Sequence, residues 1–143
     1  DLYAIPKGFE LMFTQKVTNI TAMTFCGNSL WLGTKLGKIL ILHCDDNFVE
    51  WKVKHQFVAH KGEITSLLTV QCSTGITVWS TSLCGHTASW HSDSFKNILR
   101  YVDGKPIHLA QIIKGKSLRV WTTTKSDSEC AIRVWNPEVC YVQ

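Results

Sequence analysis

The sequence has little charge and no long apolar run. Only 18% of its 143 residues are charged, below the usual quarter, whereas 45% are hydrophobic, and this balance excludes disorder along the whole chain. The longest apolar runs are four residues, as at Ile39–Leu42, which is too short for a membrane-spanning helix. No secretory signal pattern opens the chain. We therefore expect a globular domain of modest size, or part of a larger one.

The charge pattern contains no concentrated basic element. Fifteen Lys and Arg residues against eleven Asp and Glu residues give a net charge of +4. Five lysines lie between positions 35 and 61, but Asp45, Asp46 and Glu50 are interleaved with them. A nucleic-acid-binding protein concentrates its positive charge on one face or element. We therefore predict a solvated surface and no nucleic-acid partner.

The six cysteines allow two interpretations. In a secreted chain they could form three disulfides. Several of them lie in apolar, strand-like segments, where a free cysteine behaves as a small hydrophobic residue. Because no secretion signal is visible, we favour reduced, buried cysteines and a cytoplasmic location.

The sequence also lacks any stretch with a helical stripe and caps, and its periodicity is two residues. β-Branched and aromatic residues fill short segments such as Ile76–Trp79 and Ile132–Trp135. Polar breakers such as Gly27–Asn28 and Asp103–Pro106 separate these segments. The pattern predicts an all-β fold.

The segments repeat with a period of about 44 residues. Trp31 is followed by Trp79 after 48 residues and by Trp121 after a further 42. A glycine follows each of the first two tryptophan segments at the same offset, at Gly37 and Gly85. Strands that begin at Ile20, Ile64 and Ile107 lead into the three units. Four strands in 40–45 residues is the period of a β-propeller blade.

These units resemble degenerate WD40-type repeats. Ala59–His60 resembles the Gly-His step that opens such a repeat, and Ile132–Asn136 resembles its closing segment, with Asn136 in place of Asp. Leu36 and Cys84 stand where the family has a turn aspartate. The resemblance covers residues 18–143 and implies part of the hydrogen-bond network of such repeats, with His60, Ser80 or Thr81, and Trp90 in the middle unit.

The resemblance and the repeat together predict residues that stabilise the fold. Equivalent tryptophans are expected to pack between blades, because a buried indole ring removes a large apolar area from water. The residues predicted to be structural are Trp31, Trp79, Trp121, Trp90, Trp135, His60, Gly37 and Gly85.

Three blades cannot close a ring, since closure needs roughly four to eight. We therefore expect a fragment of a propeller, with an outer strand of a preceding blade and a linker at 1–17, blades at 18–57 and 58–101, and a truncated blade at 102–143. The first residue, Asp1, agrees with an excerpt. The remaining blades would come from the parent chain or another chain. A self-contained β-sandwich of eleven or twelve strands is the alternative fold.

No motif nominates a metal site, a cofactor or a catalytic centre. Cys72, Cys84, His86 and His91 match no zinc spacing, and a strand would hold His86 and His91 roughly 15 Å apart. The sequence contains no nucleophile elbow and no phosphate-binding glycine loop. We predict a non-catalytic protein without metal or cofactor.

Two functions remain, and each nominates its own residues. The first is a protein-interaction scaffold in a larger intracellular signalling or trafficking regulator, such as the Rho or Rab exchange factors and Roco-type kinases that carry divergent repeats of this kind. Its contacts would lie in the loops at 35–38, 83–86 and 125–129. The second is a membrane- or phosphoinositide-binding propeller with a rim formed by Lys52, Lys54, His55, His60 and Lys61, although no Arg-Arg pair is present.

Trp51 differs from the other tryptophans because it lies on a predicted outer strand. Trp51, Val53 and His55 are expected on one face of that strand, with Trp51 as the most exposed aromatic residue. The residues predicted to contact a partner are Trp51, Lys52, Lys54, Lys35, Lys38 and His86.

Overall fold

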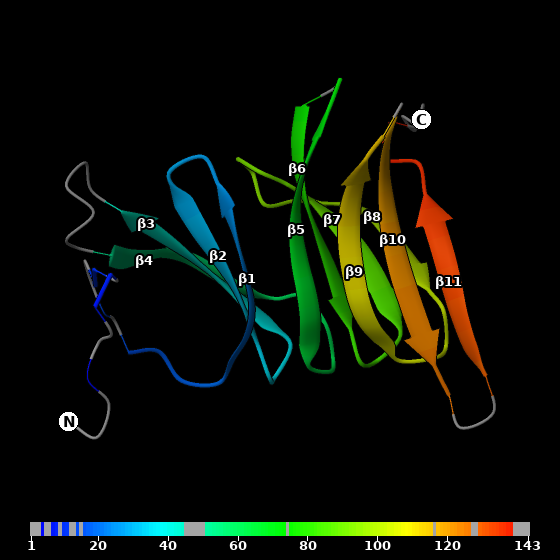
Figure 1. The fold of residues 1–143 in the computed structure, drawn as a ribbon, viewed down its shortest axis with the longest axis horizontal. Coiled ribbons are helices and arrows are strands. Elements are labelled where there is room, and N and C mark those ends of the chain that lie inside the picture. Colours follow the sequence, from blue (N-terminus) through cyan, green and yellow to red (C-terminus); the bar gives the residue numbers. More distant parts are fainter. Residues whose placement is uncertain are drawn as a thin grey trace.

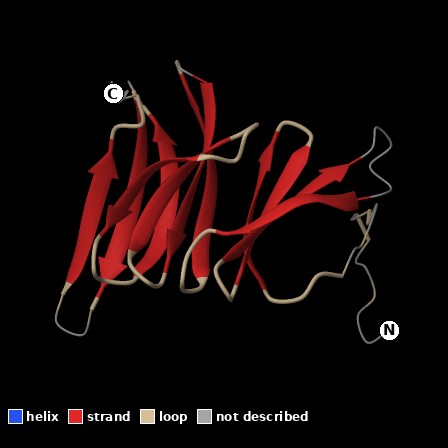
Figure 2. Cartoon of the chain, turned by 180° about the vertical axis from the view of Figure 1, so that it is seen from behind, coloured by secondary structure: helices blue, strands red, loops and turns tan. Residues whose placement is uncertain are grey.

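A computed structural model shows three antiparallel sheets in a row (Figure 1). It describes residues 4, 7–8, 10–11, 14, 16–44, 51–73, 75–115, 117–126 and 129–138. Within these residues the chain forms strands, turns and loops without a helix, as the view from behind also shows (Figure 2). The described residues accordingly include no helix long and apolar enough to cross a membrane.

Each sheet is built from strands that follow one another in the chain. The first sheet has the order β1-β2-β3-β4, the second β5-β6-β7-β8 and the third β11-β10-β9. The strands are β1 (Ile20–Cys26), β2 (Ser29–Thr34), β3 (Lys38–Cys44), β4 (Trp51–Val58), β5 (Ile64–Cys72), β6 (Gly75–Ser82), β7 (His86–His91), β8 (Asn97–Val102), β9 (Ile107–Lys114), β10 (Leu118–Lys125) and β11 (Cys130–Trp135).

The first strands of the three sheets lie next to one another. β5 contacts both β1 and β9, and Thr24 Oγ1 and Thr69 Oγ1 join β1 to β5 with a hydrogen bond of 2.9 Å. Up-and-down sheets arranged around their first strands are the blades of a β-propeller. The predicted fold class, all-β with blades of an incomplete ring, is confirmed.

Gly37 and Gly85 form equivalent turns between the second and third strands of their sheets. Their φ values are +85° and +87°, in the left-handed region that favours glycine. At Gly37 a side chain would also collide with the carbonyl oxygen of His60, only 2.0 Å from where Cβ would lie. The turns therefore require glycine, and this requirement explains why glycine recurs at the same offset in the two repeats.

Two apolar cores fill the spaces between the sheets. Val78 and Trp79 are neighbours on β6 and point to opposite faces, as alternation along a strand requires. The core between the first and second sheets contains Trp31, Ile39, Ile41, Ala59, Ile64, Leu67, Val78, Ala88 and Trp90. The core between the second and third sheets contains Val70, Trp79 and Val120, with Trp135 against it.

A β-bulge at Lys54 changes the predicted faces of β4. Val53 pairs with Leu42 and His55 pairs with Ile41, so Lys54 is the extra residue. Val53 and His55 consequently lie on opposite faces. Val53 shares a face with Trp51 as expected, whereas the expectation that His55 lies on that face was wrong. His55 stacks on Phe95 with ring centroids 4.8 Å apart, whereas Trp51 contacts Phe25 on the other face.

The tryptophan exposures also differ from the prediction. Trp51 is half-buried against Phe25, whereas Trp121 is 37% exposed. Trp121 occupies the position on β10 that Trp31 and Trp79 occupy on β2 and β6, and it points away from the core that Val120 joins. Among the described residues no fourth sheet covers that face, which leaves Trp121 partly in solvent.

The four cysteines whose burial the structure describes are less buried than predicted, and their reduced state stays a prediction. Cys26, Cys72 and Cys84 are half-buried, and Cys130 is exposed. Cys130 is exposed because it begins β11, the last strand of the third sheet.

The predicted strands at the two ends of the chain are mostly undescribed. The outer strand of a preceding blade that is predicted within 1–17 lies partly outside the described residues, and those of 1–17 that are described belong to no strand. Residues 139–143, the end of the truncated blade predicted at 102–143, lie outside the described residues.

Candidate functional site

Loops from all three sheets meet at one edge, which we call the loop face. It contains residues 35–38, 59–63, 83–85 and 103–106, together with 125, 126 and 129 at the β10–β11 connection, along the lower edge of Figure 1. Backbone hydrogen bonds join the loops: Ala59 N to Gly37 O at 2.9 Å, Leu83 N to Glu63 O at 2.9 Å and Asp103 N to Gly85 O at 2.7 Å. These bonds fix the loops relative to one another.

The exposed part of the loop face is basic and carries one prominent apolar residue. Leu36 is 78% exposed at the tip of the β2–β3 turn, between Lys35 and Lys38, which are also exposed. Lys61 is exposed on the β4–β5 connection, and Lys125 is exposed at the end of β10. An exposed leucine among lysines suits a partner surface that is acidic and has an apolar contact.

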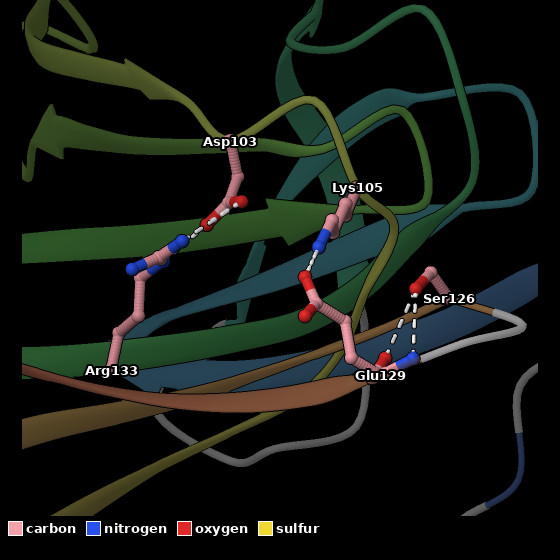
Figure 3. A network of polar contacts seen from close by, with 5 residues as sticks. All are labelled: Asp103, Lys105, Ser126, Glu129 and Arg133. Atoms are coloured by element: carbon pink, nitrogen blue, oxygen red, sulfur yellow. Dashed lines mark hydrogen bonds and ion pairs between the residues drawn. The ribbon is translucent and has the colours of Figure 1, made fainter.

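Ion pairs fasten the third sheet to the second at this edge. Arg133 on β11 pairs with Asp103, including a hydrogen bond from Nη2 to Oδ1 of 3.2 Å, and Lys105 pairs with Glu129 (Figure 3). The hydrogen bond to Asp103 raises the pKa of Arg133. Ser126 closes the β10–β11 turn by accepting a hydrogen bond from Glu129 N at 3.2 Å. Lys105 is therefore neutralised by Glu129. Among the described residues, no carboxylate forms an ion pair with Lys35 or Lys38.

A buried chain of hydrogen bonds lies next to the loop face, inside the second sheet. Ser80 Oγ accepts a hydrogen bond from Trp90 Nε1 at 2.8 Å and lies 2.7 Å from His60 Nε2. These contacts confirm the network expected in the middle unit. The third sheet repeats one part of it, since Trp135 Nε1 donates to Thr122 Oγ1 at 3.0 Å.

His60 also belongs to a cluster with Cys84 and His86. One ring nitrogen of each histidine and Cys84 Sγ all lie within 4.8 Å of one another. His60 is 3% exposed, while Cys84 and His86 are half-buried in the turn that starts β7. Gly62 permits this approach, because a Cβ there would lie 3.2 Å from Cys84 N. The β4–β5 connection and the β6–β7 turn thus bring together three groups that can bind a metal.

The surroundings favour the deprotonated form of each group in the cluster. Burial lowers the pKa of His60 to about 3, with a further contribution from Arg100 and His86. Burial also lowers the pKa of His86, assisted by Arg100 and Lys61. Burial acts to raise the pKa of Cys84, but the Ser82 hydroxyl and backbone hydrogen bonds from Gly62, Lys61 and His86 outweigh it, and the net shift is downward.

Arg100 covers the cluster from β8. Its Nη2 donates to Ala59 O at 3.0 Å, and its guanidinium lies 5.7 Å from the centroid of the Trp90 ring. Its Nη1 lies 3.2 Å from His86 Nδ1 and, because a guanidinium can only donate, His86 Nδ1 accepts this hydrogen bond. Arg100 therefore joins β8 to His86 and to the β4–β5 connection.

The outer faces of the first and third sheets are open and apolar. A groove of about 410 Å³ on the first sheet is lined by Val17, Ile20, Met23, Leu30, Leu32, Leu42 and Trp51. A groove of about 210 Å³ on the third sheet is lined by Leu109, Ala110, Gln111, Ile113, Trp121, Thr123 and Ile132. The two sheets stand at opposite ends of the row (Figure 1), so each groove faces away from the cores between the sheets.

The residues predicted to contact a partner lie in three places. Lys35, Lys38 and His86 lie at or beside the loop face. Trp51 and Lys52 lie at the other end of the first sheet, because Trp51 pairs with Cys44 whereas Val58 pairs with Lys38. Lys54 is exposed at the bulge, with Nζ 6.0 Å from the Phe95 ring centroid. The structure therefore does not gather these residues into one site.

Sequence reasoning did not predict the hydrogen bond of Arg100 with His86 or the ion pair of Asp103 with Arg133. It also did not predict that His60 lies close to Cys84 and His86. Cys84 and His86 were considered for a metal, but with Cys72 and His91, since these stand closer along the chain. His91 Nδ1 instead accepts hydrogen bonds from Asp93 N and Ser94 N, and Cys72 donates to Pro137 O. The alignment of the repeats contained a signal for the cluster. In that alignment His60 lies at the opening step of the middle repeat, and Cys84 lies at its turn position.

No model of a known protein family matches the sequence, and no curated protein sequence matches it. Solved structures do match in fold. The computationally designed Ika8 protein has a TM-score of 0.62 at 19% identity, with 82% of this chain and 33% of that chain covered. Sqt1 of Saccharomyces cerevisiae has a TM-score of 0.63 at 14% identity, with 84% and 32% covered. The chain thus spans about a third of the length of these two proteins.

The β-propeller domain of Cps50 (Swd1) from Myceliophteria thermophila is a further structural neighbour. Its TM-score is 0.58 at 16% identity, with 85% of this chain and 39% of that chain covered. At these identities the likeness concerns the fold. The chain therefore has the fold of consecutive blades of a β-propeller.

Proposed function

We propose that this chain is a non-catalytic protein-interaction segment of a WD40-like propeller in a larger intracellular signalling or trafficking regulator. The observation that carries this proposal is the loop face, where connections from all three sheets are fixed by hydrogen bonds and present Leu36 among Lys35, Lys38, Lys61 and Lys125. Rigid loops bind with a smaller loss of conformational entropy than mobile ones. The partner would be a protein with an acidic surface around an apolar contact.

The parent protein is part of the proposal. Its kind follows from the sequence resemblance to repeats in Rho or Rab exchange factors and Roco-type kinases, and the blade boundaries remain 18–57, 58–101 and 102–143. Further blades of the same architecture would cover the two open grooves. In support, Trp121 stands where Trp31 and Trp79 each pack against the next sheet.

The alternative is a membrane- or phosphoinositide-binding propeller with a rim of lysine and histidine. Lys52 and Lys54 are exposed, as this function requires. His60, however, is 3% exposed and its pKa is lowered to about 3, so it supplies no positive charge at neutral pH. The interaction scaffold is therefore the better supported of the two.

The test compares two double variants of opposite ends of the first sheet. Lys35→Glu with Leu36→Asp alters the loop face, and Lys52→Glu with Lys54→Glu is the matched control at the other end. Proteins cross-linked to each variant in cell extract are compared by mass spectrometry, and binding to phosphoinositide-containing vesicles is measured at low salt. The scaffold proposal expects loss of specific cross-links in the loop-face variant alone.

Two results would contradict the proposal. Cross-links that survive in the loop-face variant would exclude that face as the binding surface. Salt-sensitive vesicle binding that is lost in the Lys52→Glu, Lys54→Glu variant would favour the membrane function instead.

A further inference from the structure

We propose that His60, Cys84 and His86 form a binding site for one Zn²⁺ ion, with a fourth coordination position open to water. The site is independent of the proposed scaffold function. Zinc binds thiolate sulfur and imidazole nitrogen, and sites with three protein ligands leave a fourth position for water. The three candidate ligand atoms lie within 4.8 Å of one another.

The strongest indication of a metal site is that one nitrogen of the buried His60 ring has no hydrogen-bond partner in the part of the chain that the structure describes. Its Nε2 is engaged by Ser80 Oγ at 2.7 Å, whereas its buried Nδ1 has no hydrogen-bond partner among the described residues. A buried polar atom without a partner is costly in a folded protein. If Nε2–H donates to Ser80, Nδ1 keeps its lone pair, and a metal ion would satisfy it.

Ser80 and Trp90 hold the His60 ring in the way that such a ligand requires. A metal-binding histidine commonly donates its other ring N–H to a fixed acceptor, which sets its tautomer and orientation. Ser80 Oγ is such an acceptor, and Trp90 Nε1 holds it by a hydrogen bond of 2.8 Å. His60 is therefore pre-oriented as a ligand by residues that the fold already requires.

Cys84, as a thiolate, would supply the negative charge of the proposed site. Its Sγ lies 2.7 Å from Ser82 Oγ and is surrounded by backbone hydrogen bonds from Lys61, Gly62 and His86. These contacts stabilise a thiolate, which is the form that binds a metal. The thiolate also offsets part of the repulsion between a cation and the neighbouring Arg100 and Lys61.

The geometry requires a small closure of the cluster. Metal–ligand distances of about 2.0–2.3 Å place tetrahedral ligand atoms about 3.4–3.8 Å apart. His60 is 3% exposed and contacts Ser80, whereas Cys84 and His86 are half-buried, so the closure would have to come from the side chains of Cys84 and His86. The rings of His60 and His86 already approach to 6.2 Å between centroids.

Arg100 must release His86 when the ion binds. Its Nη1 donates to His86 Nδ1, which leaves the neutral ring with its proton on Nε2. Coordination through either nitrogen breaks this arrangement, because Nδ1 is either taken by the metal or protonated. Arg100 therefore competes with the metal, and its removal should strengthen binding.

The experiment uses the reduced, chelator-treated chain and Co²⁺ as a spectroscopic probe. We expect one Co²⁺ per chain, a thiolate-to-cobalt charge-transfer absorption, and displacement by one Zn²⁺. Cys84→Ser should abolish the absorption, His86→Asn should weaken binding by at least about tenfold, and Arg100→Gln should tighten it. The matched controls, Cys130→Ser and His108→Asn, alter exposed residues outside the cluster and should bind as the original chain does.

A second measurement keeps the test independent of spectroscopy. Zn²⁺ should raise the thermal unfolding midpoint of the original chain but not that of Cys84→Ser, and circular dichroism checks that both are folded. The main variants replace Cys84 and His86, because a replacement of His60 would also remove its buried contact with Ser80. The proposal is overturned by absence of the charge-transfer absorption, by its persistence in Cys84→Ser, by its loss in Cys130→Ser, or by binding of Cu⁺ without Zn²⁺.

Discussion

Ser80 Oγ accepts a hydrogen bond from Trp90 Nε1 at 2.8 Å, across two neighbouring strands of the second sheet. The same oxygen lies 2.7 Å from His60 Nε2, so one hydroxyl joins β6, β7 and the connection that enters β5. All three side chains are buried. The Ser80 hydroxyl thus links the buried side chain of Trp90 to His60, which belongs to the loop face.

Ser80→Ala should destabilise the chain more than Thr122→Val does. The first substitution leaves two buried groups without a partner and should lower the free energy of unfolding by about 2–3 kcal/mol. The second leaves only Trp135 Nε1 without its acceptor and should cost about 1 kcal/mol. Urea unfolding in chelator-containing buffer measures both. Equal losses would show that Ser80 does not join the two side chains.

Acidification should destabilise the chain through His60. Burial holds the pKa of His60 at about 3 in the folded chain, below the value of 6.5 of an unperturbed histidine. The unfolded chain therefore binds the extra proton first, and the stability contributed above pH 6.5 is lost as the pH falls toward 3. The free energy of unfolding should fall by up to about 1.4 kcal/mol per pH unit in this window.

Urea unfolding between pH 7 and pH 4 measures this dependence. His60→Gln should flatten the slope, whereas His108→Asn, which alters an exposed histidine, should leave it as it is. An unchanged slope in His60→Gln would assign the pH dependence to other groups.

Gly37→Ala should be much more destabilising than Gly27→Ala. Both glycines have positive φ, and alanine in the left-handed region costs about 1–2 kcal/mol. At Gly27 a Cβ would meet nothing within 4 Å, whereas at Gly37 it would lie 2.0 Å from His60 O. Only Gly37→Ala must therefore displace the loop that carries His60. Comparable unfolding free energies for the two variants would be evidence against this close approach.

Trp31→Ala and Trp121→Ala should differ although the two tryptophans are equivalent in the repeat. Trp31 is fully buried between two sheets, so its truncation should cost about 3–5 kcal/mol. Trp121 is 37% exposed on the open face of the third sheet, and its truncation should cost about 1–2 kcal/mol. Chemical unfolding measures both losses. In a longer chain with a further blade against Trp121, the two losses should converge.

The strands and their repetition could be predicted from the sequence because they depend on local patterns. Alternation over each strand and the recurrence of Trp31, Trp79 and Trp121 are properties of neighbouring residues and of their spacing. The need for glycine at positions 37 and 85 followed from the same repetition. The contacts of His60 with Ser80 and Trp90 were accessible because all three residues occupy repeat positions.

The positions of side chains between sheets depended on the tertiary structure. The bulge at Lys54 changes which face His55 occupies, and alternation alone contains no signal for an extra residue. The exposure of Trp121 depends on whether another sheet lies against it. His60 and Cys84 are 24 residues apart in the sequence, and only the folding of two loops against each other brings their side chains within reach of one ion. The sequence by itself thus determined the blades and their period, while the tertiary structure decided the faces, the exposures and the clusters, because those arise from contacts between segments distant in the chain.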